Sequence, residues 1–467
     1  MTVEPRLPAW WLEQALAAEG NLPPAPALAA DATADVAIVG GGYTGLWTAL
    51  ALRERAPDLQ VTLLEAEICG HGPSGRNGGF VHGYWASLAS ILPVLGEERA
   101  LELARSGERI IPGIRAWAES RGEDVWLREA GMLEVSAAPA QDSAVEKAAA
   151  AAAGVGHADQ AVALTPDEVA RRVSSPVFRG GVFFPECATV HPGLLVRGLR
   201  RAALDAGVTL HEQTPVTAVR DRELETPRGI LRAPEIVFAT NAALTGWSPA
   251  SRNLTNFGSY IVLTEPAPEL LAEIGWTGGE AIVDGRMFLH YFRTTNDGRV
   301  LMGSGSGPIG FGGRIDDRFS RDAPTSARAE AGLRRLLPGL ARVRVERAWG
   351  GPIDVSADHL PFFRTKPRTR IHFGAGYSGH GVGPAWLGGQ ILASLALGAD
   401  DEWTRSPLAT RNVPRLPPEP LRRTGGGLVR WAIMACEAAE EEGRRPPLAA
   451  RAGAALPRLL GLELGTR

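Results

Sequence analysis

The first apolar and polar positions of the chain predict a strand, a helix and a second strand. The apolar run Val36-Ala-Ile-Val39 leads into a glycine-rich turn, a stretch with helical periodicity to about Leu52, and the apolar run Val61-Thr-Leu-Leu64. Short apolar runs are typical of buried strands, and a 3.6-residue repeat is typical of a helix. Together the three elements predict a βαβ unit of the kind that binds dinucleotides.

Later parts of the chain repeat this alternation. Helical patterns cover about 88–155, interrupted by a strand at 131–136, and strands are expected at 208–211, 216–220 and 233–242. Alternating strand patterns at 257–264, 280–293 and 299–304 then predict a second, sheet-based domain, before a last strand and helix between 370 and 397. We therefore expect an α/β fold, with a Rossmann-like nucleotide domain and an interleaved antiparallel-sheet α+β substrate domain.

These patterns divide the chain into seven segments. The predicted nucleotide domain comprises 34–90, 186–250 and 346–404, and the substrate domain comprises 91–185 and 251–345. An N-terminal arm, 1–33, precedes them, and a Pro- and Arg-rich C-terminal extension, 405–467, follows. One apolar helix, 428–439, is expected in the extension and should dock on the body of the protein.

The turn of the first unit has the residues that phosphate binding requires. Gly40 permits a tight turn, Gly42 lets the backbone approach a pyrophosphate, and Gly45 allows close packing of helix on strand. Glu65, at the end of the second strand, can accept hydrogen bonds from both ribose hydroxyls. The candidate nucleotide-binding set also includes the neighbours Tyr43, Thr44 and Ala66.

Two further glycine-rich stretches indicate a cofactor larger than NAD. The loop Gly70-His-Gly-Pro-Ser-Gly-Arg-Asn-Gly-Gly-Phe80 follows the first unit, and Gly374-Ala-Gly-Tyr-Ser-Gly-His-Gly-Val-Gly383 lies between a strand and a helix. Such turns present backbone N–H groups to an acceptor. Two turns about 330 residues apart fit one cofactor that is contacted at both ends.

Composition restricts the class of protein. The formal charge of −3 gives no basic footprint for nucleic acid, and no uninterrupted apolar run approaches the length that spans a membrane. Cys69, Cys187 and Cys436 are far apart, so neither a disulfide framework nor a metal site is expected. We expect a cytoplasmic protein, and the composition does not indicate its oligomeric state.

With these motifs the chain resembles the D-amino-acid oxidase superfamily of FAD-dependent oxidoreductases. The resemblance rests on the βαβ unit, the Ser74–Gly79 loop, the Tyr291-Phe-Arg293 and Asp297-Gly-Arg299 strands and the Gly374–Gly381 turn, and it covers roughly 8–405. The pattern is most similar to the γ-glutamylputrescine oxidoreductase branch, which is related to sarcosine and glycine oxidases.

The resemblance implies roles for particular residues. The first unit would hold the ADP half of FAD, Val216 would meet the adenine through its backbone, and Ala239 and Thr240 would lie near the nucleotide. Residues beside the pyrophosphate and the flavin ring would be Ser74, Gly75, Arg76, Asn77, Gly78 and Gly79. Those at the flavin itself would be Gly376, Tyr377, Ser378, Gly379, His380, Gly381, Val382 and Gly383. Candidates for catalysis are His290, Tyr291, Arg293 and His380.

The reaction that the resemblance implies is oxidation of a carbon–nitrogen bond to an imine, with hydride transfer to flavin N5 and reoxidation by O₂ or another acceptor. Sarcosine oxidases hold FAD through a cysteine in the segment that matches Trp349–Asp354, which contains none, so FAD is expected to be non-covalent. They also have a carboxylate-binding lysine where this chain has Gly381-Val-Gly-Pro384, which favours an amine substrate.

Two alternatives stay open at this point. The first is a D- or N-methyl amino-acid oxidase or dehydrogenase in which an arginine, such as Arg76 or Arg293, binds the carboxylate. The second is a flavin-binding subunit without catalytic turnover.

Overall fold

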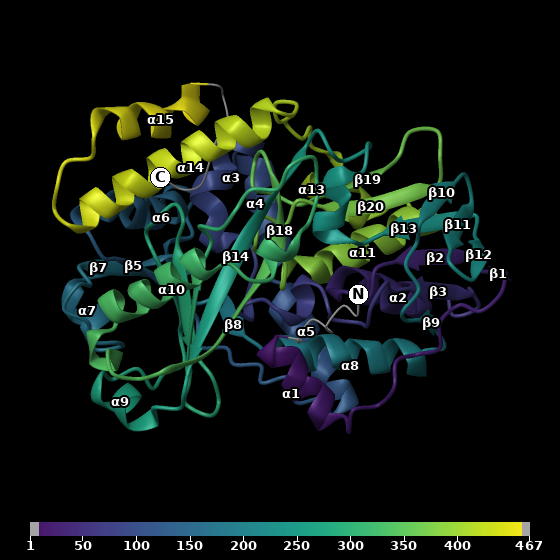
Figure 1. The fold of residues 1–467 in the computed structure, drawn as a ribbon, viewed down its shortest axis with the longest axis horizontal. Coiled ribbons are helices and arrows are strands. Elements are labelled where there is room, and N and C mark those ends of the chain that lie inside the picture. The colour runs from purple at the N-terminus through teal and green to yellow at the C-terminus, as the bar shows by residue number, and fades with distance from the viewer. Residues whose placement is uncertain (1–8, 460–467) are drawn as a thin grey trace.

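A mostly parallel six-stranded sheet forms the centre of the nucleotide domain. The computed structural model describes residues 9–459, and it places this sheet beside the larger sheet of the second domain (Figure 1). Its strands run in the order β19-β20-β13-β2-β3-β9, and only the β19–β20 pair is antiparallel. Their bounds are β2 (Val36–Val39), β3 (Val61–Leu64), β9 (Thr209–His211), β13 (Glu235–Phe238), β19 (Phe362–Thr365) and β20 (Ile371–Ala375).

Helices cover one face of this sheet and a small sheet covers the other. The helices α2 (Tyr43–Arg55), α8 (Pro192–Asp205) and α11 (Pro384–Leu397) pack against one another and on the strands. The opposite face packs against a four-stranded sheet of β1 (Ala32–Thr33), β10 (Ala218–Arg220), β11 (Glu223–Thr226) and β12 (Gly229–Arg232). Since both faces are covered, all four residues of β2 and of β3 are buried, as their unbroken apolar sequences predict.

An eight-stranded mixed sheet forms the second domain, in the order β18-β14-β17-β16-β15-β5-β7-β6. Its strands are β5 (Met132–Ser136), β6 (Val162–Leu164), β7 (Gly180–Phe184), β14 (Leu254–Thr264), β15 (Ala281–Asp284), β16 (His290–Thr294), β17 (Val300–Ser304) and β18 (Val345–Ser356). Strand β18 pairs with β14 along most of its length, so residues up to Ser356 belong to this sheet although we expected the nucleotide domain to resume at 346. The other segment boundaries stay predictions.

The expected strand 280–293 is wrong in its middle. Residues 285–289 form a turn between β15 and β16. The N–H groups of Met287 and Phe288 donate to the Glu437 carboxylate, at 2.7 and 3.3 Å, and not to a neighbouring strand. The alternation of polarity in this stretch gave no signal of that long-range contact.

Helices cover the second sheet from both sides. Helix α10 (Ala323–Leu336) packs on one face, and α6 (Asp142–Gly154) lies over β5 and β7 on the other, with α3 (Leu88–Leu95) beside it. The amphipathic region 97–121 forms two helices, α4 (Glu97–Gly107) and α5 (Ile110–Arg121). A short two-stranded sheet of β4 (Phe80–His82) and β8 (Cys187–Thr189) connects the domains.

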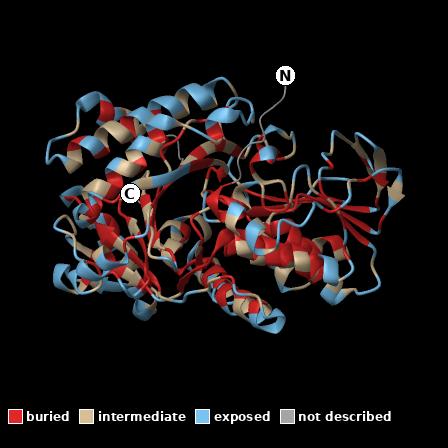
Figure 2. Cartoon of the chain, turned by 60° about the horizontal axis from the view of Figure 1, so that its bottom comes forward, coloured by how far each residue is buried: buried red, intermediate tan, exposed pale blue. Residues whose placement is uncertain are grey.

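The terminal segments dock on the body. In the N-terminal arm, α1 (Trp10–Ala18) packs on α8, and Trp11 is fully buried. The C-terminal helices α14 (Leu421–Glu441) and α15 (Leu448–Leu459) pack on each other over the second domain (Figure 1). They are among the most exposed elements of the protein (Figure 2). Residues 1–8 of the predicted arm and 460–467 of the predicted extension lie outside the described residues.

Candidate active site

The first glycine turn is so tightly packed that two of its positions require glycine. Gly40 has a φ of +112°, and a Cβ there would lie 2.5 Å from the Ala239 carbonyl oxygen. A Cβ on Gly45 would lie 2.0 Å from the Gly40 oxygen. The turn, the start of α2 and the end of β13, where Thr240 follows Ala239, are therefore brought together by backbone contact.

Glu65 closes this turn at the end of β3. Its carboxylate accepts hydrogen bonds from the Gly41 N–H at 2.7 Å and the Glu67 N–H at 3.0 Å. Burial raises the pKa of Glu65 above its ordinary value, while these two N–H donors oppose the shift. The neighbouring Ala66 is exposed, so this corner of the site opens to solvent.

The glycine-rich loop is held to the start of α2. The Tyr43 N–H donates to Ser74 Oγ at 3.0 Å, and a Cβ on Gly42 would lie 2.9 Å from the same oxygen. Ser74 and Gly75 form part of a single 3₁₀ turn, Pro73–Gly75. The loop thus runs directly beside the predicted phosphate-binding turn.

Arg76 and Asn77, which we expected to offer donors to a cofactor, also organise this loop. Arg76 donates to the carbonyl oxygens of His71 at 2.8 Å and Gly350 at 3.2 Å, and its own carbonyl accepts from Trp349 Nε1 at 2.8 Å. Asn77 Oδ1 accepts from the Gly79 N–H at 2.8 Å. Both side chains fix the backbone on which Gly78 and Gly79 lie.

A buried carboxylate holds the second glycine turn. Asp354, fully buried on β18, accepts hydrogen bonds from the N–H groups of Gly376 at 2.5 Å and Tyr377 at 3.2 Å. Its carbonyl oxygen accepts from the Ser378 N–H at 2.8 Å, and Asn241 Nδ2 donates to the carboxylate at 2.9 Å. Burial raises the pKa of Asp354 to about 7, against the lowering effect of these donors. Asp354 is therefore a positioning residue for the turn.

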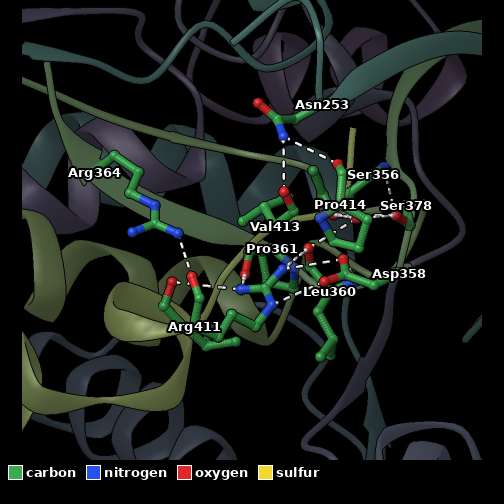
Figure 3. Close-up of polar contacts among 12 residues, drawn as sticks. Asn253, Ser356, Asp358, Leu360, Pro361, Arg364, Ser378, Arg411, Val413 and Pro414 are labelled. Atoms are coloured by element: carbon green, nitrogen blue, oxygen red, sulfur yellow. Dashed lines mark hydrogen bonds and ion pairs between the residues drawn. The ribbon is translucent and has the colours of Figure 1, made fainter. Parts of the chain in front are cut away.

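Figure 3 shows how the loop next to this turn is anchored. Arg411, from the start of the C-terminal extension, makes a two-pronged ion pair with Asp358 at 3.0 and 3.1 Å. It also donates to the carbonyl oxygens of Leu360 at 2.8 Å and Pro361 at 2.7 Å. A buried guanidinium that donates to the Asp358 carboxylate and to these carbonyl oxygens leaves the loop little freedom, and this fixes His359, which has a φ of +55°.

Three histidines gather beside the second turn. The rings of His82 and His380 lie 5.4 Å apart, and His359 is their third neighbour. Desolvation by the surrounding protein, and then the other two imidazoles, lower the pKa of His380 below its ordinary value. His380 and Gly379 still have surface exposed to solvent, and both lie in the turn where the flavin ring is expected.

The eight-stranded sheet closes this region from the other side through Tyr291. A Cβ on Gly78 would lie 3.0 Å from the Tyr291 ring, and the ring of Phe80 lies 5.7 Å from it, edge to face. The Tyr291 hydroxyl lies 2.9 Å from Ser259 Oγ. The pKa of Tyr291 is raised to about 12 by burial, so its hydroxyl stays protonated near neutral pH.

The other two catalytic candidates are held by contacts within the protein. His290 points to the opposite face of the sheet, where its Nδ1 lies 2.7 Å from the Asp284 carboxylate and a Cβ on Gly332 of α10 would meet its ring at 2.4 Å. Arg293 is buried and donates to the carbonyl oxygens of Val190 at 2.6 Å and Gly79 at 3.3 Å. Both residues therefore have structural contacts, and neither belongs to our proposed catalytic set.

The residues just after the flavin loop divide between the second turn and the core. His82 contacts His380, but Tyr84 and Trp85 are buried in the core, and Trp85 Nε1 donates to Glu108 at 2.9 Å.

Val216 is partly buried beside the nucleotide domain's second layer. Gly381, Val382 and Gly383 lead from the turn into α11.

Comparison with known proteins decides the family. The family model described as "FAD dependent oxidoreductase" matches residues 35–395, which include both glycine turns and the second sheet. The chain belongs to this family of FAD-dependent oxidoreductases.

Among residues 9–459 there is no group of three or more His, Cys, Asp or Glu that could hold a metal ion, and no helix long and apolar enough to cross a membrane.

Relatives of this oxidoreductase cover most of its length. It is 31% identical to the probable oxidoreductase OrdL of Rhizobium meliloti, over 81% of this chain and 86% of that protein. It is 29% identical to the gamma-glutamylputrescine oxidoreductase of Escherichia coli, over 82% and 88%. The crystal structure of glycine oxidase from Geobacillus kaustophilus superposes with a TM-score of 0.68 at 21% identity, over 82% of this chain and all of that one. The last similarity confirms the fold.

The residues of this oxidoreductase fit FAD. At Gly351 and Gly379, between the sheet and the second turn, a Cβ would make only ordinary contacts, at 3.7 Å to Arg76 and 3.6 Å to Ile353. The Thr44 and Tyr377 hydroxyls, 2.7 Å apart, join the first βαβ unit, which contains Glu65, to the Gly376–Gly383 turn. Sequence patterns found the glycine turns, but they gave no signal for Arg411.

A separate hollow lies outside this site. It is lined by Arg222, Arg368 and Arg370 together with the first residues of β13 and β20. Cofactors bind at the carboxyl ends of parallel strands, and this hollow lies at the amino ends.

Proposed function

We propose that this FAD-dependent oxidoreductase oxidises the carbon–nitrogen bond of a primary or secondary amine to an imine. The curated relatives include a gamma-glutamylputrescine oxidoreductase, and at 26% identity the sarcosine oxidase subunit beta of Rhizobium meliloti, whose names point to nitrogen compounds as substrates. Bound FAD supplies the acceptor for the two electrons of such a reaction. The protein then has to bind the amine, exclude water and hold the reacting carbon over the flavin.

One observation favours an amine over an amino acid. Arg76 and Arg293, the two arginines that could bind a substrate carboxylate, are both committed to main-chain carbonyl oxygens. Leaving those carbonyls unpaired would cost about 1–3 kcal/mol each. A substrate without a carboxylate next to the amine needs no such rearrangement.

Two side chains are proposed to contact the substrate region. Tyr291, with its protonated hydroxyl near Ser259, borders the flavin loop from the sheet side. His380, whose lowered pKa keeps its imidazole neutral near neutral pH, borders it from the second turn. Neutral groups on both sides suit a reaction in which the amine must be bound in its uncharged form before hydride transfer.

The electron acceptor and the compartment are also proposals. O₂ or another acceptor reoxidises the flavin. The chain has two lysines, Lys147 on α6 and Lys366 in the β19–β20 turn, and both lie away from the glycine turns. Cys69 and Cys187 are buried free thiols, which supports a reducing compartment such as the cytoplasm.

Anaerobic titration tests the function. The holoenzyme is mixed without oxygen with a panel of amines and amino acids, and the flavin absorbance near 450 nm is followed. Bleaching by amines supports the proposal, and bleaching by amino acids alone would favour an amino-acid oxidase or dehydrogenase. If nothing in the panel bleaches the flavin, the amine assignment fails. Admission of air with a peroxide assay then distinguishes O₂ from another acceptor.

A further inference from the structure

Glu134 lies on the same face of the eight-stranded sheet as Tyr291. In the strand register Glu134 is opposite Val283, and Val283 is opposite Tyr291. Directly paired residues point to the same face of a sheet. Adjacent strands are 4.7–4.9 Å apart, so Glu134 lies about 10 Å across the sheet from the tyrosine that contacts the flavin loop.

The row from Glu134 to Tyr291 is covered less closely than the rest of the sheet. Glu134, Val283 and Tyr291 are all partly exposed, although they lie in the middle of a sheet. Residues of the opposite face at the same level are completely buried: Leu133, Ile282 and Phe292. Beyond Glu134, its other partner Val182 is also fully buried where α6 packs on β7. The partly exposed row therefore starts at Tyr291 and ends at Glu134.

Glu134 has a charge with no counterion. Within residues 9–459 its carboxylate has no hydrogen bond or ion pair, and Asp284 is the charged group that acts on it. Burial, and then the negative charge of Asp284, raise the pKa of Glu134 to about 7. An unpaired carboxylate in such surroundings is costly, and a bound cation would remove that cost.

We propose that Glu134 binds a second cationic group of the substrate, so that the preferred substrates are diamines or longer polyamines. The nitrogen to be oxidised lies on the Tyr291 side, and the distal ammonium pairs with Glu134 at the far end of the row. The apolar chain between the two nitrogens crosses Val283. This inference rests on the proposed amine oxidation and adds a charge requirement to it.

The first test compares matched substrates. Anaerobic flavin reduction is measured for wild type and Glu134→Gln with α,ω-diamines of four to eight carbons and with monoalkylamines of the same lengths. Glu134→Gln should lower the ratio of reduction rate to dissociation constant by about 10- to 100-fold for the best diamine, and by less than about threefold for the monoamine. Glu146→Gln, which changes an exposed carboxylate on α6, is the control and should match wild type.

The second test needs no turnover. Butane-1,4-bis(trimethylammonium), which has no N–H or lone pair for oxidation, should bind the holoenzyme at least about tenfold more tightly than tetramethylammonium, and Glu134→Gln should abolish the difference. Equal binding of the dication by wild type and Glu134→Gln would overturn the role of Glu134. The role of Glu134 would also be overturned if Glu134→Gln lowered the ratio of reduction rate to dissociation constant equally for diamines and monoamines. The proposed amine oxidation would still hold in that case. If no amine bleaches the flavin, the proposed function fails, and the dication experiment still decides the anionic site.

Discussion

Thr44 Oγ1 and Tyr377 Oη lie 2.7 Å apart in the interior, although 333 residues separate them in the chain. Thr44 lies in the first turn of α2, beside the predicted pyrophosphate position, and Tyr377 lies in the turn at the flavin end. The bond therefore fixes the spacing between the two turns that would hold the two ends of FAD. Fixed spacing before binding lowers the entropy cost of binding.

The pair should act as one unit. Tyr377→Phe and Thr44→Val each remove the bond, at a cost of about 1 kcal/mol, and each should raise the dissociation constant of FAD by about fivefold. The double variant should bind FAD no more weakly than the weaker single variant, because the same bond is lost. Flavin fluorescence titration of apoprotein measures all three. Thr226→Val, which removes a hydroxyl bonded to the Gly229 oxygen in the small sheet, is the control. Additive losses would show that the two hydroxyls act independently.

Gly45 should tolerate no side chain. An alanine methyl group there would lie 2.0 Å from the Gly40 carbonyl oxygen, and backbone on both sides cannot move away without opening the turn. Gly45→Ala should lose more than about 4 kcal/mol of unfolding free energy or fail to retain FAD. Gly72→Ala is the matched control, since a methyl group at Gly72 would meet nothing within 4 Å. Thermal unfolding and the flavin-to-protein absorbance ratio report both effects, and retention of full FAD content by Gly45→Ala at wild-type stability would contradict the role.

How far the sequence predicts this molecule depends on the range of the interaction. The unit from Gly40 to Glu65 is determined by neighbours in sequence, and its strand, helix and acid are where the pattern placed them. Alternation along β16 also places His290 and Tyr291 on opposite faces of the sheet. It could not show which of them faces the flavin loop, because both faces of that sheet are covered. That choice depends on the packing of α10.

Contacts between distant strands had no sequence signal of their own. Asp354 reaches the second turn only because β18 ends beside β20, and Arg411 reaches Asp358 only because the chain returns after α11. A glutamate such as Glu134 within a strand resembles an ordinary surface position until the register places it next to Val283. Such residues follow from topology, which local patterns do not determine.

The flavin is expected to be released from the denatured protein. Strand β18 contains no cysteine, and the described thiols lie elsewhere: Cys69 contacts the first glycine turn, Cys187 is on β8 and Cys436 is on α14. Acid precipitation should therefore leave the yellow colour in the supernatant, with an absorption spectrum and chromatographic mobility of free FAD. Flavin retained in the washed pellet would demonstrate a covalent bond that this arrangement does not predict.

Asp354 should be more important for flavin binding than for the chemistry itself. In Asp354→Asn the carboxamide NH₂ must face the N–H group of Gly376 or Tyr377, both of which now donate to the carboxylate. We expect a loss of about 2 kcal/mol of stability, weaker FAD binding and a shifted flavin spectrum. Asp316→Asn, at an exposed helix cap, is the control. Wild-type affinity and spectrum in Asp354→Asn would show that the turn does not need this anchor.

His191 should make the protein sensitive to acid. It is 1% exposed, surrounded by Trp10, Trp11 and Trp126, and its Nδ1 accepts from the Leu194 N–H while Nε2 bonds to Gln14. Burial, helped by Arg293, lowers its pKa to about 3. Between pH 6.5, where an ordinary histidine titrates, and pH 3, the unfolded chain binds one proton more than the folded chain, so lowering the pH favours unfolding.

The size of the effect can be isolated by substitution. Between pH 6.5 and 5 this residue should remove about 2 kcal/mol of unfolding free energy. Asn accepts the same helix-capping hydrogen bond without titrating. His191→Asn should therefore lose stability at pH 7 through poorer packing. Its free energy of unfolding should fall between pH 6.5 and 5 by about 2 kcal/mol less than that of wild type. His211→Asn, at a partly exposed imidazole bonded to the Pro26 oxygen, should keep the wild-type fall. Urea unfolding of the three proteins at both pH values gives the comparison. An unchanged fall in His191→Asn would mean that the imidazole is already protonated in the folded protein, which its two hydrogen bonds and the surrounding indole rings oppose.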